Sequence, residues 1–496
     1  MSRPPKLVLT VIDGMKPTML ERAIGSGSAP ALKAIRDRGT YVDSCCAAFP
    51  SVTPVCAGTI ATGRMNDEHR IPSMNWFSRS EGRYIEYGSS FQASRKFGLT
   101  GQLVDTIFNM NEHHLSPHTP TIFETLDDAG VRTACTSYLI FRGRHEHEVS
   151  RDWALTRVAS QLFQKRRVMG PQELFYADIF ASRKTGCWSR MGIPGMRDQH
   201  GGCVSCYLVE HDLFDFLLLS LPDNDAHSHK HGPHSQIASI ARADAELWRD
   251  MEAGGGADAF LDEHAMIVMA DHSHSHIERV IDFTGPFDDW KVLQPSAANM
   301  RSAELALCPA QRSAMIYLLT DGPSRAGALP RIIATARAIE GVDLVMWWGD
   351  GGRATRRAHV AGERGELTFR PADGGDGAAD ERGLHWDVDG DLETLVASVQ
   401  DRRFASDHYP DALRRVWSAL SCPTSGDVLL SAEPAYEFPD WGKRAHVRGG
   451  SHGSLHRVDS LGALLFCGLD CPPGREHGPW SLDDIAPMVL GHFGAG

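Results

Sequence analysis

The sequence predicts an α/β protein with a central, mostly parallel sheet that is covered by helices. Three continuous apolar runs of strand length carry this prediction, at residues 7–12, 216–221 and 266–270. Such runs are typical of strands buried on both faces of a parallel sheet. Helical segments lie between these runs along the chain, and alternation of strand and helix indicates a doubly wound domain.

The helices are expected at residues 18–38, 120–129 and 236–252. The third of them is followed by Gly254, Gly255 and Gly256, a run that ends a helix. We expect one domain over residues 1–496, since one large α/β domain with insertions fits this length.

Two insertions interrupt this pattern. Residues 64–116 are rich in Asn, Ser, Tyr and Arg and show little periodicity, which predicts a long loop or a cap over a site. Residues 321–408 combine a helix-like piece, a strand at 343–348, Gly-rich turns and further short strands. We interpret this second insertion as a partly β subdomain.

Composition excludes several functional classes. The 496 residues are 42% hydrophobic and 23% charged, which is ordinary for a globular protein and argues against disorder or coiled coil. The formal charge of −13 argues against a nucleic-acid polymer as partner. No apolar run approaches the ~20 residues of a membrane span, and no signal-peptide pattern is present. The eleven cysteines are scattered and odd in number, so we expect mostly reduced thiols and a cytoplasmic protein.

Residues of the types that bind metals follow each of the three strands. Asp13 follows the first strand, Asp223 and His227 follow the second, and Asp271 with His272 follow the third. Ligands of open α/β sheets gather beyond the carboxyl ends of the strands, so these side chains can converge on one site. Carboxylate and imidazole without clustered thiolates suit Zn²⁺, with Mn²⁺ as a second choice. Each motif alone also fits a turn or a solvated loop; the three together favour a metal site.

Thr53 is the candidate nucleophile. It precedes Pro54 and a small-residue helix at residues 55–62, and Pro is common at the first position of a helix. Backbone N–H groups at a helix start favour anions, and a metal can lower the pKa of a hydroxyl and free its oxygen for attack. A simple helix-capping role for Thr53 is compatible with this function.

Five motifs occur in the order found in the alkaline phosphatase superfamily: VIDG, FPSVT-P, PDNDAH…HGP, ADH and GSHGS. The sequence is most similar to the type I phosphodiesterase/nucleotide pyrophosphatase branch. The resemblance implies an alkaline-phosphatase-like three-layer fold and two zinc ions. It also implies one ion held by Asp13, Thr53, Asp271 and His272. The second ion would be held by Asp223, His227 and His452, the last taken from GSHGS.

The sequence also departs from that branch. Nucleotide-cleaving members usually have Phe-Pro-Asn after the nucleophile, where this chain has Pro54, Val55 and Cys56. The second metal motif carries two extra residues between His227 and Gly232-Pro233, so His229 or His231 competes as the ligand. The Cys-x-Pro/Ala-x-Arg motif of sulfatases is absent, which argues against sulfate esters.

Other candidates have weaker signals. Arg142, Arg144 and His145 follow a strand-like run and could contact a phosphate, although a basic surface loop is the simpler interpretation. Trp76 and Tyr84 fit either a substrate pocket or the core.

The sequence therefore predicts a metal-dependent phosphoric ester hydrolase, of the phosphodiesterase/nucleotide pyrophosphatase type, that forms a phosphothreonine on Thr53. Its substrate would be a small anionic phosphoester. A phosphomonoesterase, a phosphonate (C–P) hydrolase and a non-catalytic metal-binding protein are the alternatives. The sequence does not predict the oligomeric state.

Overall fold

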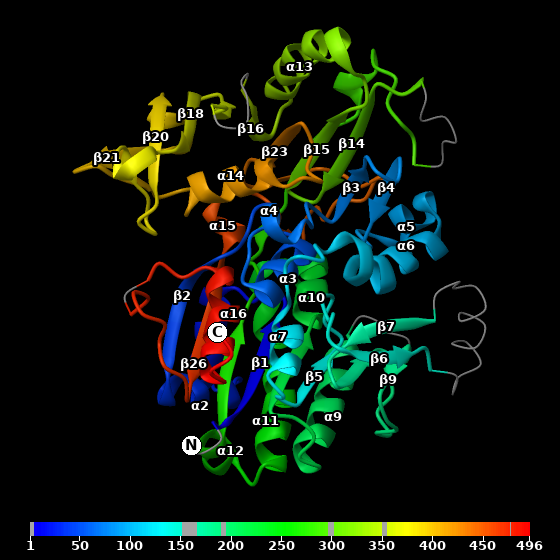
Figure 1. Cartoon of the computed structure of the whole chain (residues 1–496), viewed down its shortest axis with the longest axis vertical. Helices are drawn as coiled ribbons and strands as arrows, with labels where there is room; N and C mark the ends of the chain where they lie inside the picture. The colour runs from blue at the N-terminus through cyan, green and yellow to red at the C-terminus, as the bar shows by residue number, and fades with distance from the viewer. Residues whose placement is uncertain (1–3, 151–165, 190–194, 296–301, 350–354, 477) are drawn as a thin grey trace.

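The computed structural model describes residues 4–150, 166–189, 195–295, 302–349, 355–476 and 478–496. In this part of the chain two sheets lie one above the other (Figure 1). The lower sheet has eight strands and the upper sheet has ten. α3 (Thr53–Thr62) and α4 (Asn66–His69) lie between them (Figure 1).

The lower sheet contains the three strands that the sequence predicts. β1 pairs in parallel with β10 on one side and with β11 on the other, so these strands are neighbours. β26 and β2 extend the sheet with antiparallel pairs, and β9 closes the other edge. In spatial order the strands are β2 (Thr40–Cys46), β26 (Leu461–Cys467), β11 (His264–Met269), β1 (Lys6–Ile12), β10 (Phe216–Leu221), β5 (Thr133–Thr136), β8 (Glu173–Tyr176) and β9 (Phe180–Ala181).

Strand β1 is buried on both faces because its alternate side chains enter two separate hydrophobic cores. Leu7, Leu9 and Val11 belong to one core, whereas Val8 and Ile12 belong to the other. Successive side chains of a strand point to opposite faces, so both faces of this sheet must be covered. The predicted α/β class with a mostly parallel central sheet is confirmed.

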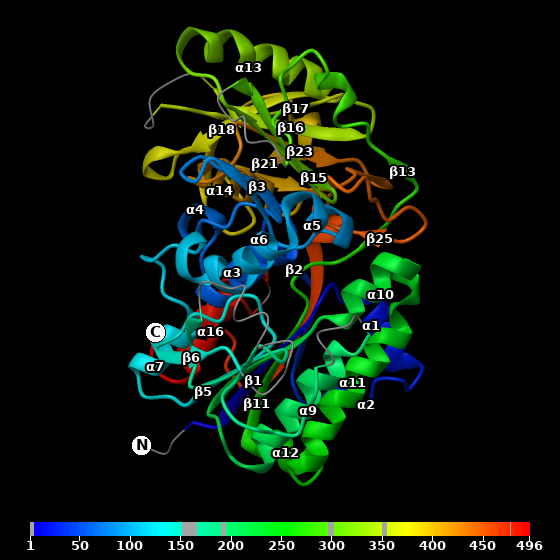
Figure 2. The ribbon, with the colours of Figure 1, turned by 90° about the vertical axis from the view of Figure 1, so that its right-hand side faces the viewer.

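Helices cover the two faces of the lower sheet in separate groups (Figure 2). One group packs on the core that contains Val8: α1 (Pro17–Gly25), α2 (Pro30–Arg38), α9 (Arg197–Glu210), α11 (Gln236–Ala253) and α12 (Ala257–Glu263). The other group packs on the core that contains Leu9: α3 (Thr53–Thr62), α7 (Ile122–Asp128) and α16 (Ile485–His492). The expected helix at 18–38 is two helices, because Ser26, Gly27 and Ser28 interrupt it.

Residues 64–116 are more regular than the sequence indicates. They form a two-stranded hairpin and several short helices, which lie beside the upper sheet (Figure 1). The elements are α4 (Asn66–His69), β3 (Asn75–Ser78), β4 (Arg83–Glu86), α5 (Phe91–Phe97), α6 (Leu99–Val104) and a π-helix, η1 (Asp105–His114). Short elements of mixed period leave no clear hydrophobic repeat, which is why the sequence predicts a loop here.

The upper sheet is almost entirely antiparallel. The expected strand at 343–348 is β16, and Pro330 lies inside helix α13 (Gly322–Arg337). In spatial order the strands are β14 (Leu305–Ala310), β15 (Ser313–Leu318), β23 (Val428–Ala432), β16 (Val342–Trp348), β17 (Ala358–Gly362), β18 (Gly365–Pro371), β20 (His385–Gly390), β19 (Ala378–Ala379), β22 (Arg403–Ser406) and β21 (Ala397–Gln400). The division of the chain into one domain with insertions at 64–116 and 321–408 stays a prediction.

Shorter elements connect the two sheets. α10 (Asp223–His231) follows β10 of the lower sheet, and α15 (Arg457–Ser460) directly precedes β26. α14 (Ala412–Ser421) lies in the chain between β22 and β23 of the upper sheet. The remaining strands are β6 (His145–Glu148), β7 (Arg167–Gly170), β12 (Ser275–His276), β13 (Arg279–Val280), β24 (Tyr436–Glu437) and β25 (Gly450–Ser451). Within the described ranges, no helix combines the length and the apolar character needed to cross a membrane.

One pair of cysteines is oxidised. Cys187 and Cys203 form a disulfide with a Cα–Cα distance of 5.8 Å, and the other nine cysteines are free thiols. The expectation of mostly reduced thiols therefore holds for all but this pair. The disulfide ties the segment before α9 to the helix itself.

Candidate metal centre

Four of the residues expected at the site lie together at the carboxyl edge of the lower sheet. Asp13 follows β1, Asp271 and His272 follow β11, and Thr53 begins α3. The Nε2 atom of His272 lies 3.4 Å from Oδ1 of Asp13 and 3.4 Å from Oδ2 of Asp271. The hydroxyl of Thr53 lies 3.3 Å from the same nitrogen. Strands far apart in sequence thus bring their polar ends to one point, as parallel sheets do.

A second cluster adjoins the first. The Oδ1 atom of Asp225 lies 3.2 Å from Nε2 of His229 and 3.4 Å from Nε2 of His452. The ring of His452 also stacks on the ring of His272, with 3.5 Å between ring centroids. Asp225 and His229 come from α10, and His452 follows β25. The two clusters form one continuous centre.

Asp223 and His227 do not lie in this centre, which differs from the sequence expectation. The carboxylate of Asp223 accepts hydrogen bonds from the backbone N–H groups of Arg197 (2.8 Å) and Asp198 (3.1 Å) at the start of α9. His227 is half-buried and faces Arg242, with 3.4 Å between Nδ1 and Nη2. Asp223 therefore caps a helix, and His227 lies on the outer side of α10.

Helix geometry explains the difference. α10 contains two Asp-x-x-x-His pairs, offset from each other by two residues. Residues four apart share a helix face, whereas residues two apart lie about 200° apart, so only one pair can face the centre. The pair that does is Asp225 with His229. The distance to Gly232-Pro233 is the sequence signal that identifies this pair. His227 lies two residues too far from that dipeptide, whereas His229, two residues later in the chain, has the expected spacing.

The imidazoles of the centre are held in one orientation. His272 donates Nδ1–H to the carbonyl of Ser273 (3.2 Å), His229 to that of Gly450 (2.8 Å) and His452 to that of Ser51 (2.8 Å). In each ring the Nε2 lone pair is then directed toward the carboxylates. This pattern of a backbone-anchored Nδ1 and a free Nε2 is typical of metal-binding histidines.

His274 is an additional histidine beside the centre, which the sequence alone leaves open between a partner that orients a ligand and a solvated loop residue. Its Nε2 lies 2.9 Å from Oδ1 of Asp225, and the side chain is fully buried. Gly14 makes room for it: a Cβ atom at that position would lie 2.5 Å from Nε2 of His274. Gly14 also has a φ of +66°, which favours glycine. The N–H of Gly14 donates to Asp271 (3.0 Å).

Electrostatics of the centre favour a bound cation. Burial, together with the neighbouring Asp271 and Asp225, raises the pKa of Asp13 well above its ordinary value. Burial also raises the pKa of Asp271 to about 6 and lowers that of His272 to about 4. Oδ1 of Asp13, Oδ2 of Asp271 and Nε2 of His452 are buried and have no hydrogen-bond partner among the described residues. A donor set of free carboxylate oxygens and neutral imidazoles fits divalent metal ions.

An ion pair from the upper sheet supports the loop that carries His452. The backbone N–H of Arg312, between β14 and β15, donates to the carbonyl of His452 (3.0 Å). The guanidinium of Arg312 pairs with Asp459, and both side chains are fully buried. Asp459 in turn accepts from the backbone N–H and the hydroxyl of Ser454 (2.8 Å each). The position of His452 thus depends on the upper sheet, a relation that the sequence does not reveal.

A cavity of about 380 Å³ lies beside the nucleophile candidate. Thr53, Asp13, Asp225 and Asp271 line it. Sequence analysis did not identify most of its other walls, since apolar residues in loops carry no recognisable motif. The cavity is large enough for a small organic ester.

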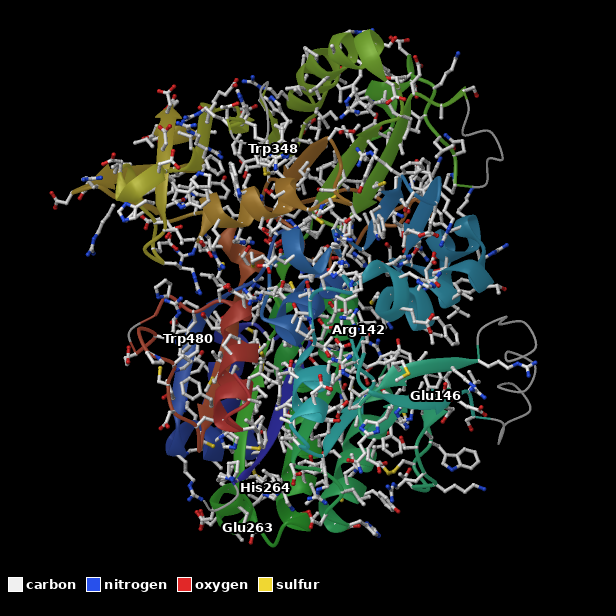
Figure 3. All side chains as sticks on the ribbon, in the orientation of Figure 1. Arg142, Glu146, Glu263, His264, Trp348 and Trp480 are labelled. Carbon is white, nitrogen blue, oxygen red and sulfur yellow. A yellow bond between two sulfur atoms is a disulfide. The ribbon has the colours of Figure 1, made fainter. Side chains whose placement is uncertain are left out.

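The weaker candidates have structural roles. Arg142, labelled in Figure 3, bonds to Glu124 (3.0 Å) and to the carbonyl of Thr119 (2.7 Å), so it fixes a loop. Trp76 is 2% exposed, and the hydroxyl of Tyr84 donates to the carbonyl of Leu293 (2.8 Å), which places both in the core.

Carboxylates and imidazoles gathered beside a threonine hydroxyl are chemically suited to a metal-dependent hydrolase of phosphoric esters. The family model for type I phosphodiesterase/nucleotide pyrophosphatase matches residues 7–329. The chain therefore belongs to this family, whose members act on ester bonds. No curated protein sequence matches the chain.

Solved structures show the same fold at low sequence identity. Phosphonoacetate hydrolase from Sinorhizobium meliloti 1021, in complex with phosphonoformate, is 18% identical with a TM-score of 0.57; the match covers 99% of this chain and 100% of that one. Human ectonucleotide pyrophosphatase/phosphodiesterase 5 is 14% identical with a TM-score of 0.55, covering 99% and 95%. An inactive threonine-to-alanine variant of the murine protein, in complex with AMP, is 13% identical with a TM-score of 0.55, covering 99% and 95%.

Proposed function

We propose that this protein hydrolyses small monoanionic phosphoric esters, with Thr53 as the nucleophile. The observation that carries the proposal is the position of the Thr53 hydroxyl. It lies 3.3 Å from Nε2 of His272, beside buried carboxylate oxygens of Asp13 and Asp271 that have no hydrogen-bond partner among the described residues. The chain belongs to a family of phosphoric ester hydrolases, and this arrangement suits the reaction that such enzymes catalyse.

Two divalent metal ions are proposed for the centre. Asp13, Asp271, His272 and the Thr53 oxygen would hold the first ion. Asp225, His229 and His452 would hold the second, so Asp225 and His229 replace Asp223 and His227 in our assignment. Oxygen and nitrogen donors without thiolates suit Zn²⁺, and Mn²⁺ is the second choice.

When bound, the two ions would lower the pKa of a hydroxyl or of water and neutralise charge on the phosphoryl oxygens. The Thr53 hydroxyl loses its proton, and its oxygen attacks phosphorus in line with the leaving group. The bond from phosphorus to the leaving-group oxygen breaks, and the leaving group departs as an alcohol or a phenolate. The phosphothreonine that remains still carries the second organic group of the diester. Water then cleaves this ester and restores the hydroxyl. The N-terminal N–H groups of α3 favour the anion that lies beside Thr53, while the histidine Nδ1–H bonds to backbone keep the rings from turning.

A charge balance supports a phosphodiester or another monoanion as the substrate. Three carboxylates face the centre, from Asp13, Asp225 and Asp271. Two divalent ions would leave one net positive charge, which matches a monoanionic ester better than a dianionic monoester. Phosphomonoester and C–P hydrolysis stay predictions that a substrate panel can rank.

The first experiment compares bis(p-nitrophenyl) phosphate, p-nitrophenyl phosphate and a p-nitrophenyl nucleotide ester on zinc-loaded protein. We expect bis(p-nitrophenyl) phosphate to have the highest kcat/KM and the monoester p-nitrophenyl phosphate the lowest. Thr53→Ala should abolish turnover while the bound zinc, measured by elemental analysis, stays near wild type. If wild type cleaves none of the three esters although zinc is bound, the protein is a metal-binding protein and the proposal is wrong.

The second experiment tests the ligands on α10 with a matched pair of variants. His229→Gln should lose about one metal ion per chain, because it removes a proposed ligand. His227→Gln, two residues earlier on the same helix, should retain both ions. Equal metal content in the two variants, or loss only in His227→Gln, would contradict the assignment of Asp225 and His229.

Two further expectations remain predictions. A cytoplasmic location agrees with the nine free thiols, whereas the Cys187–Cys203 disulfide would need an oxidising environment. A small phosphoester remains the expected partner.

A further inference from the structure

The cavity beside Thr53 has walls that are mainly apolar and aromatic. The segment between α3 and α7 forms one wall, and the chain that follows β5 and β8 forms the other. Partial enclosure by rings and aliphatic side chains is typical of a pocket that binds an organic group. The residues that carry the argument are Met74, Tyr87 and Ile107 on the first wall, and Tyr138, Tyr176 and Ile179 on the second.

The cationic side chains of the cavity are already engaged or neutral. Arg197 donates its Nε–H to Asp223 (2.9 Å) and its Nη2–H to the carbonyl of Pro222 (2.9 Å). Burial lowers the pKa of His200, so this ring is neutral at pH 7. Lysine is absent from the part of the lining that the structure describes. Among the described lining residues, a second negative charge on the substrate would therefore find no free cation.

Tyr87 offers the cavity its aromatic ring and not a free hydroxyl group. Its hydroxyl lies 2.8 Å from Nδ1 of His114, and burial keeps the pKa of Tyr87 well above its usual value. The phenol thus remains protonated and engaged with His114. Tyr176 packs its ring on Phe141, with 5.5 Å between centroids, and is the least buried of the three cavity tyrosines.

From these walls and charges we propose that the cavity binds an uncharged aryl or alkyl substituent of the phosphoric ester. This inference rests on the proposed function and specifies its substrate class. A phosphodiester in which one organic group is apolar fits both halves of the site: the carboxylate-rich centre takes the phosphoryl group, and the aromatic walls take the substituent. Substituents that carry a carboxylate or a further phosphate are disfavoured, because the described lining offers their desolvated charge no free cation.

Three p-nitrophenyl diesters test the inference, and they differ only in the second substituent: benzyl, methyl or carboxymethyl. Release of p-nitrophenolate reports every reaction, so the leaving group is constant. We expect kcat/KM for the benzyl ester to exceed that for the methyl ester by at least about tenfold. Burial of the additional phenyl ring in an apolar pocket of fitting size stabilises the bound ester by enough to give this ratio. The carboxymethyl ester should be slower than the methyl ester.

Two variants link the preference to the cavity. Tyr176→Ala should reduce the benzyl-to-methyl ratio several-fold, because it removes a ring from the wall. Tyr207→Ala is the control: Tyr207 lies on α9, stacks on His211 and is not part of the lining. Leu103→Lys places a cation at the cavity on a side chain that is 41% exposed, so folding should tolerate it. This variant should raise the carboxymethyl-to-methyl ratio several-fold.

The outcomes separate the two proposals. If none of the esters is cleaved by zinc-loaded protein, the proposed function and this inference both fall. If esters are cleaved but the benzyl ester is no better than the methyl ester, or the carboxymethyl ester is preferred, only this inference is overturned. An unchanged benzyl-to-methyl ratio in Tyr176→Ala would also overturn it.

Discussion

Replacing Arg312 by methionine should destabilise the protein strongly, although Arg312 is not a proposed metal ligand. The guanidinium donates to the hydroxyl of Ser275 (2.7 Å) and to the carbonyls of Glu433 (2.8 Å) and Tyr436 (3.1 Å), and it pairs with Asp459. Methionine fills much of the same volume but leaves Asp459 buried without its cation. Breaking a buried pair in this way costs about 3–5 kcal/mol.

That cost can be converted into a change in melting temperature. Globular proteins unfold with an entropy of about 2.1 cal/mol/K per residue, or about 1 kcal/mol/K for 496 residues. A loss of 3–5 kcal/mol then lowers Tm by about 3–5 °C. Calorimetry of zinc-loaded protein measures the shift, and elemental analysis should show weaker retention of metal, because the backbone of Arg312 supports His452.

A matched control and a double variant make the prediction specific. Arg337→Met removes an exposed ion pair with Glu366, in which both side chains are about 40% accessible, and should change Tm by no more than about 1 °C. Arg312→Met combined with Asp459→Asn should cost less than the sum of the two single variants. The reasoning would be refuted by a Tm for Arg312→Met within 1 °C of wild type, or by strictly additive effects.

Three further predictions concern stability. Burial raises the pKa of Glu86 to about 7, so its contribution is largest below the unfolded pKa of about 4.3 and is lost as pH rises toward 7. The Tm of wild type relative to Glu86→Gln should therefore fall between pH 5 and 7.5; a constant difference would show that Glu86 titrates normally. Zinc at about 1,000 times its Kd should stabilise metal-free protein by about 4 kcal/mol per site, raising Tm by about 4 °C per site, and chelation should reverse this; an unchanged Tm would argue against the centre. Cys203→Ser opens a disulfide that spans 16 residues and should cost about 3 kcal/mol, measured as a Tm lower by about 3 °C; a wild-type Tm would mean that the bond does not form in solution.

Local sequence signals predicted the part of the centre that depends on strands. Asp13, Asp271 and His272 each follow a continuous apolar run, and a parallel sheet brings such positions to one edge whatever the loops do. The helix start at Thr53 was predictable for a similar reason, because Pro54 fixes the backbone there. The positions of these residues follow from the local strand and helix signals of the sequence, which the folded chain retains.

The places of the remaining residues in the centre cannot be predicted from the sequence of a single strand or helix. α10 offers two Asp–His pairs of the same internal spacing, and the packing of the helix against α11 and β25 places Asp225 and His229 at the centre. His452 was found through a family motif, and nothing local distinguishes it among 24 histidines. The support that Arg312 and Asp459 give it joins residues 147 positions apart. The cavity walls come from short elements whose hydrophobic period changes every few residues.

Gly14 has a consequence for anyone who alters or transplants this centre. It supplies no ligand, yet the smallest possible side chain there would collide with His274 and so disturb Asp225 from behind. Transferring the proposed metal ligands alone to another protein would therefore not reproduce the centre, because Gly14 must be transferred with them. The space that Gly14 leaves for the ring of His274 is as much a part of the centre as the ligand atoms themselves.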